Sequence, residues 1–456
     1  MVIGSHICFG YGLPALDVKI VFVRKNMARF FQLEKLILFL FIFTLSWQTR
    51  VFLFGGGSFF NEWTSGYLYA SDILLLLLLG LWLLRVAGQR QKKICVSWRL
   101  EIILGIFWLL GGFSLFWAVD RILSLYAWAK LTELLLLFFY ARHNRRLFGR
   151  PPIFFAFILG AVFQGVLAIA QFFRQQSWGL KWLGESPLAP GISGVAKIDF
   201  FGQKIMRAYG TLPHPNLLGV LMLLALVLFL AYILKNGWRF WQTAPLGVLF
   251  FGLGLSFSRL AILAFLISFL VLFIYGLKQK IYRRRIWGLL FLFIIFGLLL
   301  WGAVGQVLSQ RFDWGQLKNS QAVDLRAYYL QIGWAMFWQR PWGVGVGAFA
   351  NQFMLNFKSL GIVLESWVYQ PIHNIYLLVA VELGFVGLVV LFWFFSEILR
   401  VVFRYKDGLF KLIALIIFGG FLFLGFFDHY FWTLQQGQLL FWGMLGLLVV
   451  NCSSQF

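Results

Sequence analysis

Charged residues are scarce in this sequence of 456 residues, of which Asp, Glu, Lys and Arg make up 12%, against about 25% in an average soluble domain. Hydrophobic residues make up 61%, and the mean hydropathy is +0.84. This composition excludes an ordinary soluble enzyme, and it excludes a disordered chain because disorder needs low hydrophobicity. Apolar runs this long also exclude a β-barrel, whose strands alternate polar and apolar residues. The class that remains is an all-α, polytopic membrane protein.

Cysteines and metal-binding motifs are also few or missing. Three cysteines are too few for a disulfide framework. The sequence has no paired-acid Asp-x-Asp element, no Cys/His spacing typical of a metal site and no Gly-x-Ser-x-Gly turn of a hydrolase. These absences disfavour a nucleotide-sugar enzyme that uses a divalent cation, so we expect neither a metal nor another cofactor.

Long apolar runs predict about twelve membrane-spanning helices, since one span needs about 20 apolar residues. The predicted spans cover residues 33–54, 67–84, 100–119, 122–140, 153–173, 215–234, 241–257, 260–277, 286–305, 372–394, 412–427 and 434–450. No cleavable signal peptide is evident, so we expect the first run to be a permanent span. Residues 1–32 are expected to be a cytoplasmic segment, with Met27 as an alternative start to Met1.

Positive charge dominates among the few charged residues, with 39 Lys and Arg against 16 Asp and Glu and a net charge of +23. In a soluble protein this excess would suggest nucleic acid, but basic loops also hold membrane helices with one side toward the cytoplasm. With the N-terminus in the cytoplasm, 24 of the 39 basic residues fall in cytoplasmic loops. We therefore expect both termini on the cytoplasmic side of the inner membrane and no nucleic-acid partner.

The predicted topology divides the chain into parts with different roles. Spans one to nine occupy residues 33–305 and include an outside loop at 174–213. A large extracytoplasmic loop at 306–371 separates them from spans ten to twelve at 372–450. The large loop is long enough for a small helical subdomain, which we expect there.

One stretch of the large loop, Asp324–Arg340, has the pattern of an amphipathic helix. Its apolar face is formed by Leu325, Tyr329, Ile332 and Met336. We expect Asp324 to cap this helix and Pro341 to end it. A helix of this kind also suits the surface of a bilayer, so the apolar face alone does not indicate catalysis.

Several Arg and His residues lie at the outer ends of spans, where the topology predicts few cations. Arg207 and His214 belong to the turn that leads into the span at 215–234, and His214 is more readily explained by that turn than by catalysis. Arg259 follows a very short connection between two spans, so it lies close to the hydrocarbon region of the membrane. It is either a candidate for binding phosphate or an arginine whose long side chain extends to the membrane interface. His373 lies at the start of span ten, where it could act as a general base near neutral pH or cap the helix.

A glycine-rich segment, Pro341–Gly347, follows the amphipathic stretch. Gly343, Gly345 and Gly347 alternate with valines, and their backbone amides could surround an anion. The segment is not a nucleotide-binding P-loop because no Gly-Lys-Ser/Thr follows it.

The order, spacing and common sidedness of these pieces resemble the O-antigen ligase and O-antigen polymerase family over about residues 200–450. No single piece carries the resemblance. The pieces are Arg207–Asn216, Ser258-Arg259, Arg326 through Trp334 to Pro341–Gly347, His373-Asn374 with Glu382-Leu-Gly384, and Asp428–Gly437.

The resemblance implies an inverting, metal-independent glycosyltransferase with a C-type membrane fold. Such an enzyme takes a glycan from an undecaprenyl diphosphate carrier on the extracytoplasmic side and passes it to an acceptor hydroxyl in surface polysaccharide biosynthesis. The resemblance implies catalytic roles for Arg207, Arg259 and His373, with the arginines facing the diphosphate and the histidine the hydroxyl. It also implies substrate-binding roles for Arg326, His214, Asn374, Gly343, Gly345 and Gly347.

Two other functions remain open from the sequence. A polysaccharide polymerase shares its donor motifs with a ligase, so the sequence does not separate the two. A non-enzymatic flippase or transporter of lipid-linked glycans also has many spans, but it should show a polar path through the bilayer and internal repeats, and neither is evident here.

Overall fold

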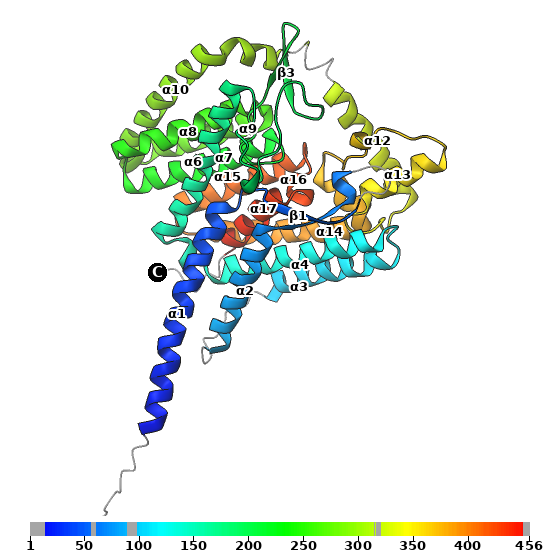
Figure 1. Ribbon diagram of the computed structural model, residues 1–456. Coiled ribbons are helices and arrows are strands. Elements are labelled where there is room, and N and C mark those ends of the chain that lie inside the picture. Colours follow the sequence, from blue (N-terminus) through cyan, green and yellow to red (C-terminus); the bar gives the residue numbers. More distant parts are fainter. Residues whose placement is uncertain (1–13, 56–60, 89–97, 314, 316–320, 450–456) are drawn as a thin grey trace, which may run out of the picture.

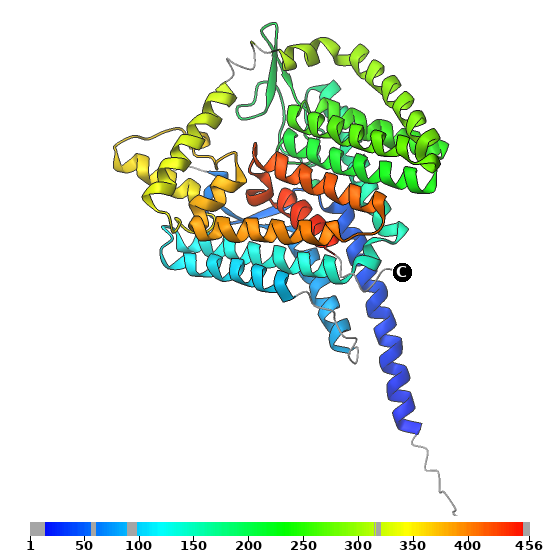
Figure 2. The same cartoon turned by 180° about the vertical axis from the view of Figure 1, so that it is seen from behind.

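Helices form almost all regular structure in the computed structural model, which describes residues 14–55, 61–88, 98–313, 315 and 321–449 (Figures 1 and 2). Each predicted span overlaps one helix. These helices are α1 (Pro14–Thr44), α2 (Ala70–Gly88), α3 (Trp98–Phe113), α4 (Arg121–His143), α6 (Pro151–Arg174), α7 (Pro215–Asn236), α8 (Thr243–Leu255), α9 (Arg259–Lys278), α10 (Lys280–Phe312), α14 (Ile375–Phe403), α15 (Gly408–Gly425) and α17 (Gln435–Leu448). The other α-helices are α5 (Arg145–Phe148), α12 (Gln321–Gln339), α13 (Phe349–Ser359) and α16 (Tyr430–Thr433). Single 3₁₀ turns are η1 (Glu62–Thr64), η2 (Ser114–Phe116), η3 (Lys181–Leu183), η4 (Phe240–Gln242) and η5 (Ser366–Val368).

Nine helices in the described part of the chain are long and apolar enough to cross a membrane. They are α2, α3, α4, α6, α7, α9, α10, α14 and α15. The remaining three predicted spans correspond to α1 and to the shorter helices α8 and α17, of 13 and 14 residues. The prediction of an all-α, polytopic membrane protein is confirmed.

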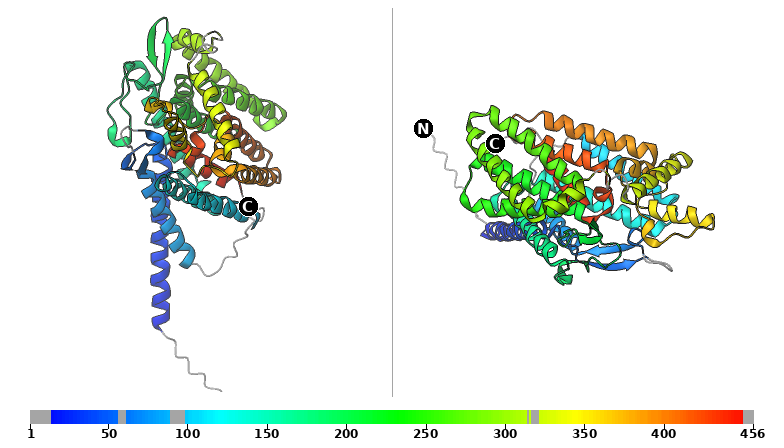
Figure 3. Two further views of the ribbon diagram at one scale, coloured as in Figure 1. Left: turned by 90° about the vertical axis from the view of Figure 1, so that its right-hand side faces the viewer. Right: turned by 90° about the horizontal axis from the view of Figure 1, so that it is seen from above.

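The helices form two groups with a central layer between them. Helices α3 and α4 lie beside α14, while α6 to α10 form the second group, and α16 and α17 lie between the two (Figures 1 and 3). Helix α7 is apolar around its whole circumference, which suits a position surrounded by other helices. Its burial confirms that position, since 83% of the residues in its most apolar 18-residue stretch are buried.

Two short antiparallel strand pairs accompany the helices in the described part of the chain. The predicted span 33–54 is wrong at its end, because α1 stops at Thr44 and Arg50–Phe54 forms strand β1. Strand β1 pairs in antiparallel fashion with β2 (Gly66–Tyr69), which occupies the start of the predicted span 67–84. Hydropathy alone does not separate a short apolar strand from a helix end.

The second hairpin lies in the predicted outside loop and joins β3 (Lys197–Phe200) to β4 (Gln203–Met206). Its two turn residues, Phe201 and Gly202, both have positive φ, at 49° and 81°. Positive φ at both central residues is the geometry of the tight turns that match the twist of a hairpin.

Helices α12 and α13 pack with the start of α14 around an apolar cluster that is separate from the main core. Tyr329 and Met336 of α12 pack there with Phe353 of α13, as the predicted apolar face requires. The predicted cap is wrong, since α12 begins at Gln321 and Asp324 therefore lies in its first turn. An acidic side chain in the first turn still interacts favourably with the helix dipole, which explains why the sequence pattern resembled a cap.

Candidate active site

Four arginines from four segments meet at one end of the helix bundle. Arg207 follows β4, Arg259 begins α9, Arg311 lies at the end of α10 and Arg326 lies near the start of α12. Each of the other three repels the charge of Arg207. We refer to these four residues as the arginine cluster. Three of its members were predicted from the sequence, and Arg311 was not.

Arg207 is the most rigidly held member of the arginine cluster. It is buried, its Nε donates to the carbonyl oxygen of Ser256 at 2.8 Å, and its Nη2 donates to Oδ1 of Asn216 at 2.7 Å. Burial first, and then repulsion from Arg311, lower the pKa of Arg207 to about 9. The guanidinium is therefore still charged at pH 7, and its surroundings favour the approach of an anion.

Asp428 connects the arginine cluster to the rest of the site. One of its carboxylate oxygens accepts from Nδ2 of Asn216 at 3.0 Å and lies 3.7 Å from Nη2 of Arg326. Burial alone would raise the pKa of Asp428, but the neighbouring histidines and Arg326 outweigh it and hold this pKa well below its usual range. Asp428 is consequently ionised at neutral pH.

A histidine pair lies on the other side of Asp428. The rings of His373 and His429 are 4.7 Å apart and nearly perpendicular, and Tyr329 of α12 stacks on His373 at 5.8 Å. His373 precedes α14, whereas His429 follows Asp428 directly after α15. The structure thus brings together two histidines that are 56 positions apart in the sequence.

The hydrogen bond of His373 determines which of its nitrogens can act as a base. Its Nδ1 lies 3.2 Å from the carbonyl oxygen of Pro371. A carbonyl oxygen only accepts, so Nδ1 carries the proton and Nε2 carries the lone pair. Burial, the largest influence, lowers the pKa of His373, while the charge of Asp428 raises it. The ring is therefore neutral at pH 7, as a general base must be.

The histidine pair and Asp428 also have donor atoms that could bind a metal ion. One nitrogen of each ring and one oxygen of Asp428 lie within 4.8 Å of one another. The sequence did not indicate this group, because its members come from two separate segments. The neighbouring Arg326 ion pair opposes a cation at this position, since the carboxylate already has a positively charged partner.

His214 and Asn374, two predicted substrate-binding residues, cap helices in this structure. Nδ1 of His214 accepts from the backbone nitrogen of Asn216 at 3.1 Å, at the start of α7. Burial lowers the pKa of His214 to about 3, so the ring is neutral. Oδ1 of Asn374 accepts from the backbone nitrogen of Leu377 at 2.9 Å, at the start of α14. Both side chains position the helix ends from which the site is built.

The glycine-rich segment has a different role from the anion cradle that the sequence suggested. Its amides already donate within the protein, those of Val344 and Gly345 to the carbonyl oxygens of Val381 and Glu382 at 2.9 and 3.0 Å. The amide of Gly347 donates to the carboxylate of Glu382 at 2.9 Å. These bonds dock the segment on α14, so we correct the predicted role of its glycines from anion binding to packing.

Close packing explains why these positions are glycines. Gly343, Gly345 and Gly347 have φ of +100°, +109° and +70°, values that favour glycine. A Cβ on Gly343 would lie 2.5 Å from the carbonyl oxygen of Glu382. In α14, Gly384 has φ of +75°, and a Cβ there would lie 2.5 Å from the carbonyl carbon of Trp342.

A cavity of about 280 Å³ opens beside the histidine pair. We refer to it as the active-site cavity. Its polar lining includes Arg50 and Glu62, which form an ion pair, together with His214, His373, Asp428 and His429. Arg50 and Glu62 were missed from the sequence because they come from β1 and η1, in a stretch predicted to be partly a span.

A comparison with protein families finds a match in this part of the chain. Residues 244–392 match the family model described as O-antigen ligase, whereas no curated protein matches the chain. The matched region runs from α8 to α14 and includes Arg259, Arg311, Arg326 and His373. It points to an enzyme of glycosyltransferase or ligase type that acts on lipid-linked glycans in a membrane. The match thus shows similarity to the O-antigen ligase family over about a third of the chain.

Proposed function

We propose that this protein is a glycosyltransferase that moves a glycan from an undecaprenyl diphosphate carrier to a hydroxyl of a glycan or lipid acceptor. The observation that carries the proposal is the meeting of the arginine cluster and the histidine pair on either side of Asp428. One side of the site suits a diphosphate, and the other suits a hydroxyl that loses its proton.

The arginine cluster supplies the positive charge that a diphosphate leaving group needs. Negative charge develops on the bridging oxygen as the glycosidic bond to the carrier breaks, and fixed cations stabilise that charge. Arg207 is held in one orientation by Ser256 and Asn216, so little reorganisation accompanies the reaction. Guanidinium groups are also the side chains that bind phosphate oxygens in bidentate fashion.

His373 acts as the general base in this proposal. Its Nε2 takes the proton of the acceptor hydroxyl while the acceptor oxygen forms a bond to the anomeric carbon. The bond from that carbon to the diphosphate breaks at the same time, and its electron pair leaves with the diphosphate. Attack from the face opposite the leaving group inverts the anomeric configuration.

We further propose that the reaction needs no metal and takes place on the extracytoplasmic side of the cytoplasmic membrane. The arginines take the role that a divalent cation has in many transferases. All members of the arginine cluster and the histidine pair lie in segments that the distribution of basic loops predicts to be outside. The same pattern predicts both termini on the cytoplasmic side.

Transfer by purified protein in lipid nanodiscs tests this function. The reaction contains a polyprenyl diphosphate-linked glycan and an oligosaccharide or lipid acceptor, and both the glycosidic product and the released carrier are measured. We expect His373→Ala to lower transfer by about 10²–10⁴-fold, the usual contribution of a general base. His143→Ala, an exposed histidine at the end of α4, is the matched control and should retain activity.

The outcomes separate the alternatives. Full activity of His373→Ala would overturn its assignment as the base. Movement of the carrier across the bilayer without a new glycosidic bond would instead indicate a flippase. Products extended by a second lipid-linked repeat would identify a polymerase, and a single transfer to a lipid acceptor would identify a ligase.

A further inference from the structure

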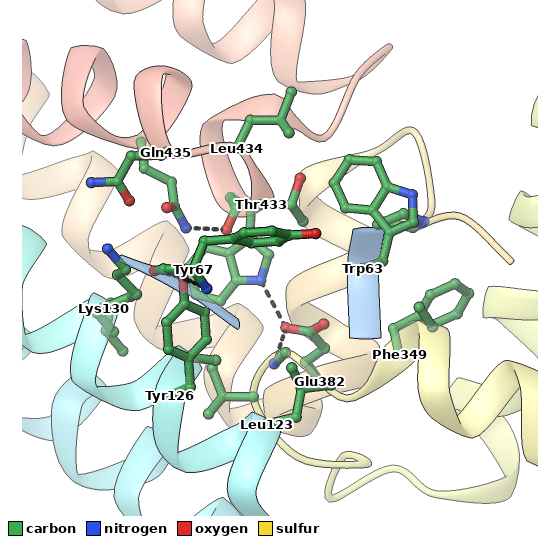
Figure 4. Close-up of a pocket in the computed structure, with 18 of the residues that line it drawn as sticks. Trp63, Tyr67, Leu123, Tyr126, Lys130, Phe349, Glu382, Thr433, Leu434 and Gln435 are labelled. Atoms are coloured by element: carbon green, nitrogen blue, oxygen red, sulfur yellow. Dashed lines mark hydrogen bonds between the residues drawn. The ribbon is translucent and has the colours of Figure 1, made fainter. Parts of the chain in front are cut away.

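A second cavity, of about 120 Å³, lies beside the active-site cavity. We refer to it as the aromatic pocket. Its aromatic lining consists of Trp63, Tyr67, Tyr69, Tyr126, Phe349, Trp432 and Trp442. Figure 4 shows Trp63 and Phe349 on one side of Tyr67, and Lys130 and Gln435 on the other. The pocket thus has ring surfaces together with several polar groups.

Hydrogen bonds and ion pairs within the protein fix several of the polar groups that line the aromatic pocket. The carboxylate of Glu382 accepts from Nε1 of Trp432 at 2.8 Å, which also orients that indole ring. Lys130 forms ion pairs with Asp72 and, at 3.6 Å, with Glu133. The pocket is therefore preorganised, as small-molecule sites usually are.

The aromatic pocket adjoins the histidine pair. Trp63 lines both cavities, and its ring lies 5.0 Å from that of His429. Pro371, whose carbonyl accepts from His373, also lines the aromatic pocket. Thr433 lines it too, and its hydroxyl lies 2.6 Å from Nδ1 of His429. A group bound in the pocket would lie directly beside the reacting centre.

We infer that the aromatic pocket binds one sugar residue of the glycan substrate, an inference that rests on the proposed function. A pyranose ring has an apolar face of C–H groups and a rim of hydroxyls, so it needs aromatic surfaces and fixed polar groups together. The volume holds roughly ten water-sized groups, close to the heavy atoms of about one hexose residue. The sugar belongs either to the donor glycan or to the acceptor.

Variants of Trp63 test this site because the residue lines the pocket without forming part of the base or the arginine cluster. We expect Trp63→Leu to raise the KM for one substrate about tenfold with a smaller change in kcat, since an aromatic contact is lost. Trp63→Phe keeps a ring and should stay close to the wild type. Tyr126→Leu probes the same pocket from α4. Trp182→Leu is the matched control, because Trp182 is 90% exposed.

Direct binding separates this inference from the proposed function. Saturation-transfer NMR on the nanodisc protein uses a panel of free hexoses, N-acetylhexosamines and uronic acids. Signals that Trp63→Leu and Tyr126→Leu weaken would support the pocket even if the wild type transferred no glycan. If the wild type is active and both variants keep its KM and its sugar signals, the aromatic pocket does not bind a sugar, while the proposed transferase function is unaffected. A raised KM for the donor assigns the sugar to the donor, and a raised KM for the acceptor assigns it to the acceptor.

Discussion

The acid limb of the pH profile of transfer should move in opposite directions in two variants of the site. The charge of Asp428 raises the pKa of His373, whereas that of Arg326 lowers it. His373 acts in its neutral form, so transfer falls as the pH drops through this pKa. Asp428→Asn lowers the pKa and should move the acid limb to lower pH. Arg326→Gln raises the pKa and should move the limb to higher pH.

The geometry sets the size of these shifts. A nitrogen of His373 and an oxygen of Asp428 lie within 4.8 Å, a distance at which two unit charges interact by about 3.5 kcal/mol at an effective dielectric constant of about 20. Arg326 compensates part of this interaction through its own ion pair with Asp428. We therefore expect the limb to move by roughly one pH unit in Asp428→Asn. The shift in Arg326→Gln should be smaller, because the Arg326 side chain is 35% exposed.

The assay is kcat/KM for transfer in nanodiscs between about pH 4.5 and 8, normalised to the plateau of each protein. Normalisation matters because both variants should also lose activity at the plateau through weaker donor binding. Arg340→Gln is the matched control, since Arg340 lies beyond the other end of α12 and bonds to Gln352. Limbs that move in the same direction, or that do not move, would refute His373 as the titrating base.

Three further predictions concern the donor site, the packing and the metal. Arg207→Lys should lower transfer on the order of 10²-fold because an ammonium group lacks the fixed fork of a guanidinium, whereas the exposed Arg174→Lys should not, and equal rates would exclude phosphate contact. Gly345→Ala should lower the free energy of unfolding by about 1–3 kcal/mol, because φ is +109° and a Cβ would lie 2.6 Å from that of Ala118. The readout is a lower midpoint of thermal unfolding in detergent, with Gly80→Ala, which has open space around it, as the control. An unchanged midpoint for Gly345→Ala would contradict the packing. Transfer by protein treated with a chelator should keep its rate. Recovery only after addition of a divalent cation would refute the metal-independent reaction and would make the histidine pair and Asp428 the candidate ligands.

The sequence predicts the helices well because length and hydropathy set the energetics of crossing a bilayer. A backbone without internal hydrogen bonds is too costly in hydrocarbon, so an apolar run of sufficient length becomes a helix. The errors occur where that constraint ends. Residues 50–54 are as apolar as a helix end, yet they pair with β2 beside the active-site cavity. Hydropathy carries no information about that pairing.

The candidate site was only partly predictable, for a related reason. Arg207, Arg259 and His373 stand out because cations are unexpected at outer helix ends. Arg311 has the same chemistry, but at the end of a long span it looks like an interfacial anchor. Its proximity to Arg207 depends on how α10 packs against the rest of the bundle, which no local pattern encodes.

The glycine-rich segment shows why a correct motif can suggest the wrong role. A sequence reveals that amides can be exposed at Gly343 and Gly345, but it does not reveal which acceptors they meet. The acceptors are available because Gly384 interrupts α14, so that the amide of Phe385 donates to Pro341 at 2.9 Å. The carbonyl of Val381, its ordinary helical partner, then accepts from the segment instead. The break in α14 and the docking of the glycine-rich segment therefore depend on each other, and only the folded chain brings the two segments together.

Asp428 separates the charge of the arginine cluster from His373. In the proposed reaction, the arginine charges that bind the diphosphate would, without that carboxylate, also lower the pKa of His373 and weaken it as a base. With it, part of the charge of Arg326 is compensated at the boundary between the two halves of the site. Bound diphosphate would compensate more of the arginine charge and raise the pKa of His373 further. The base would then be strongest when the donor is in place, which couples donor binding to proton removal from the acceptor.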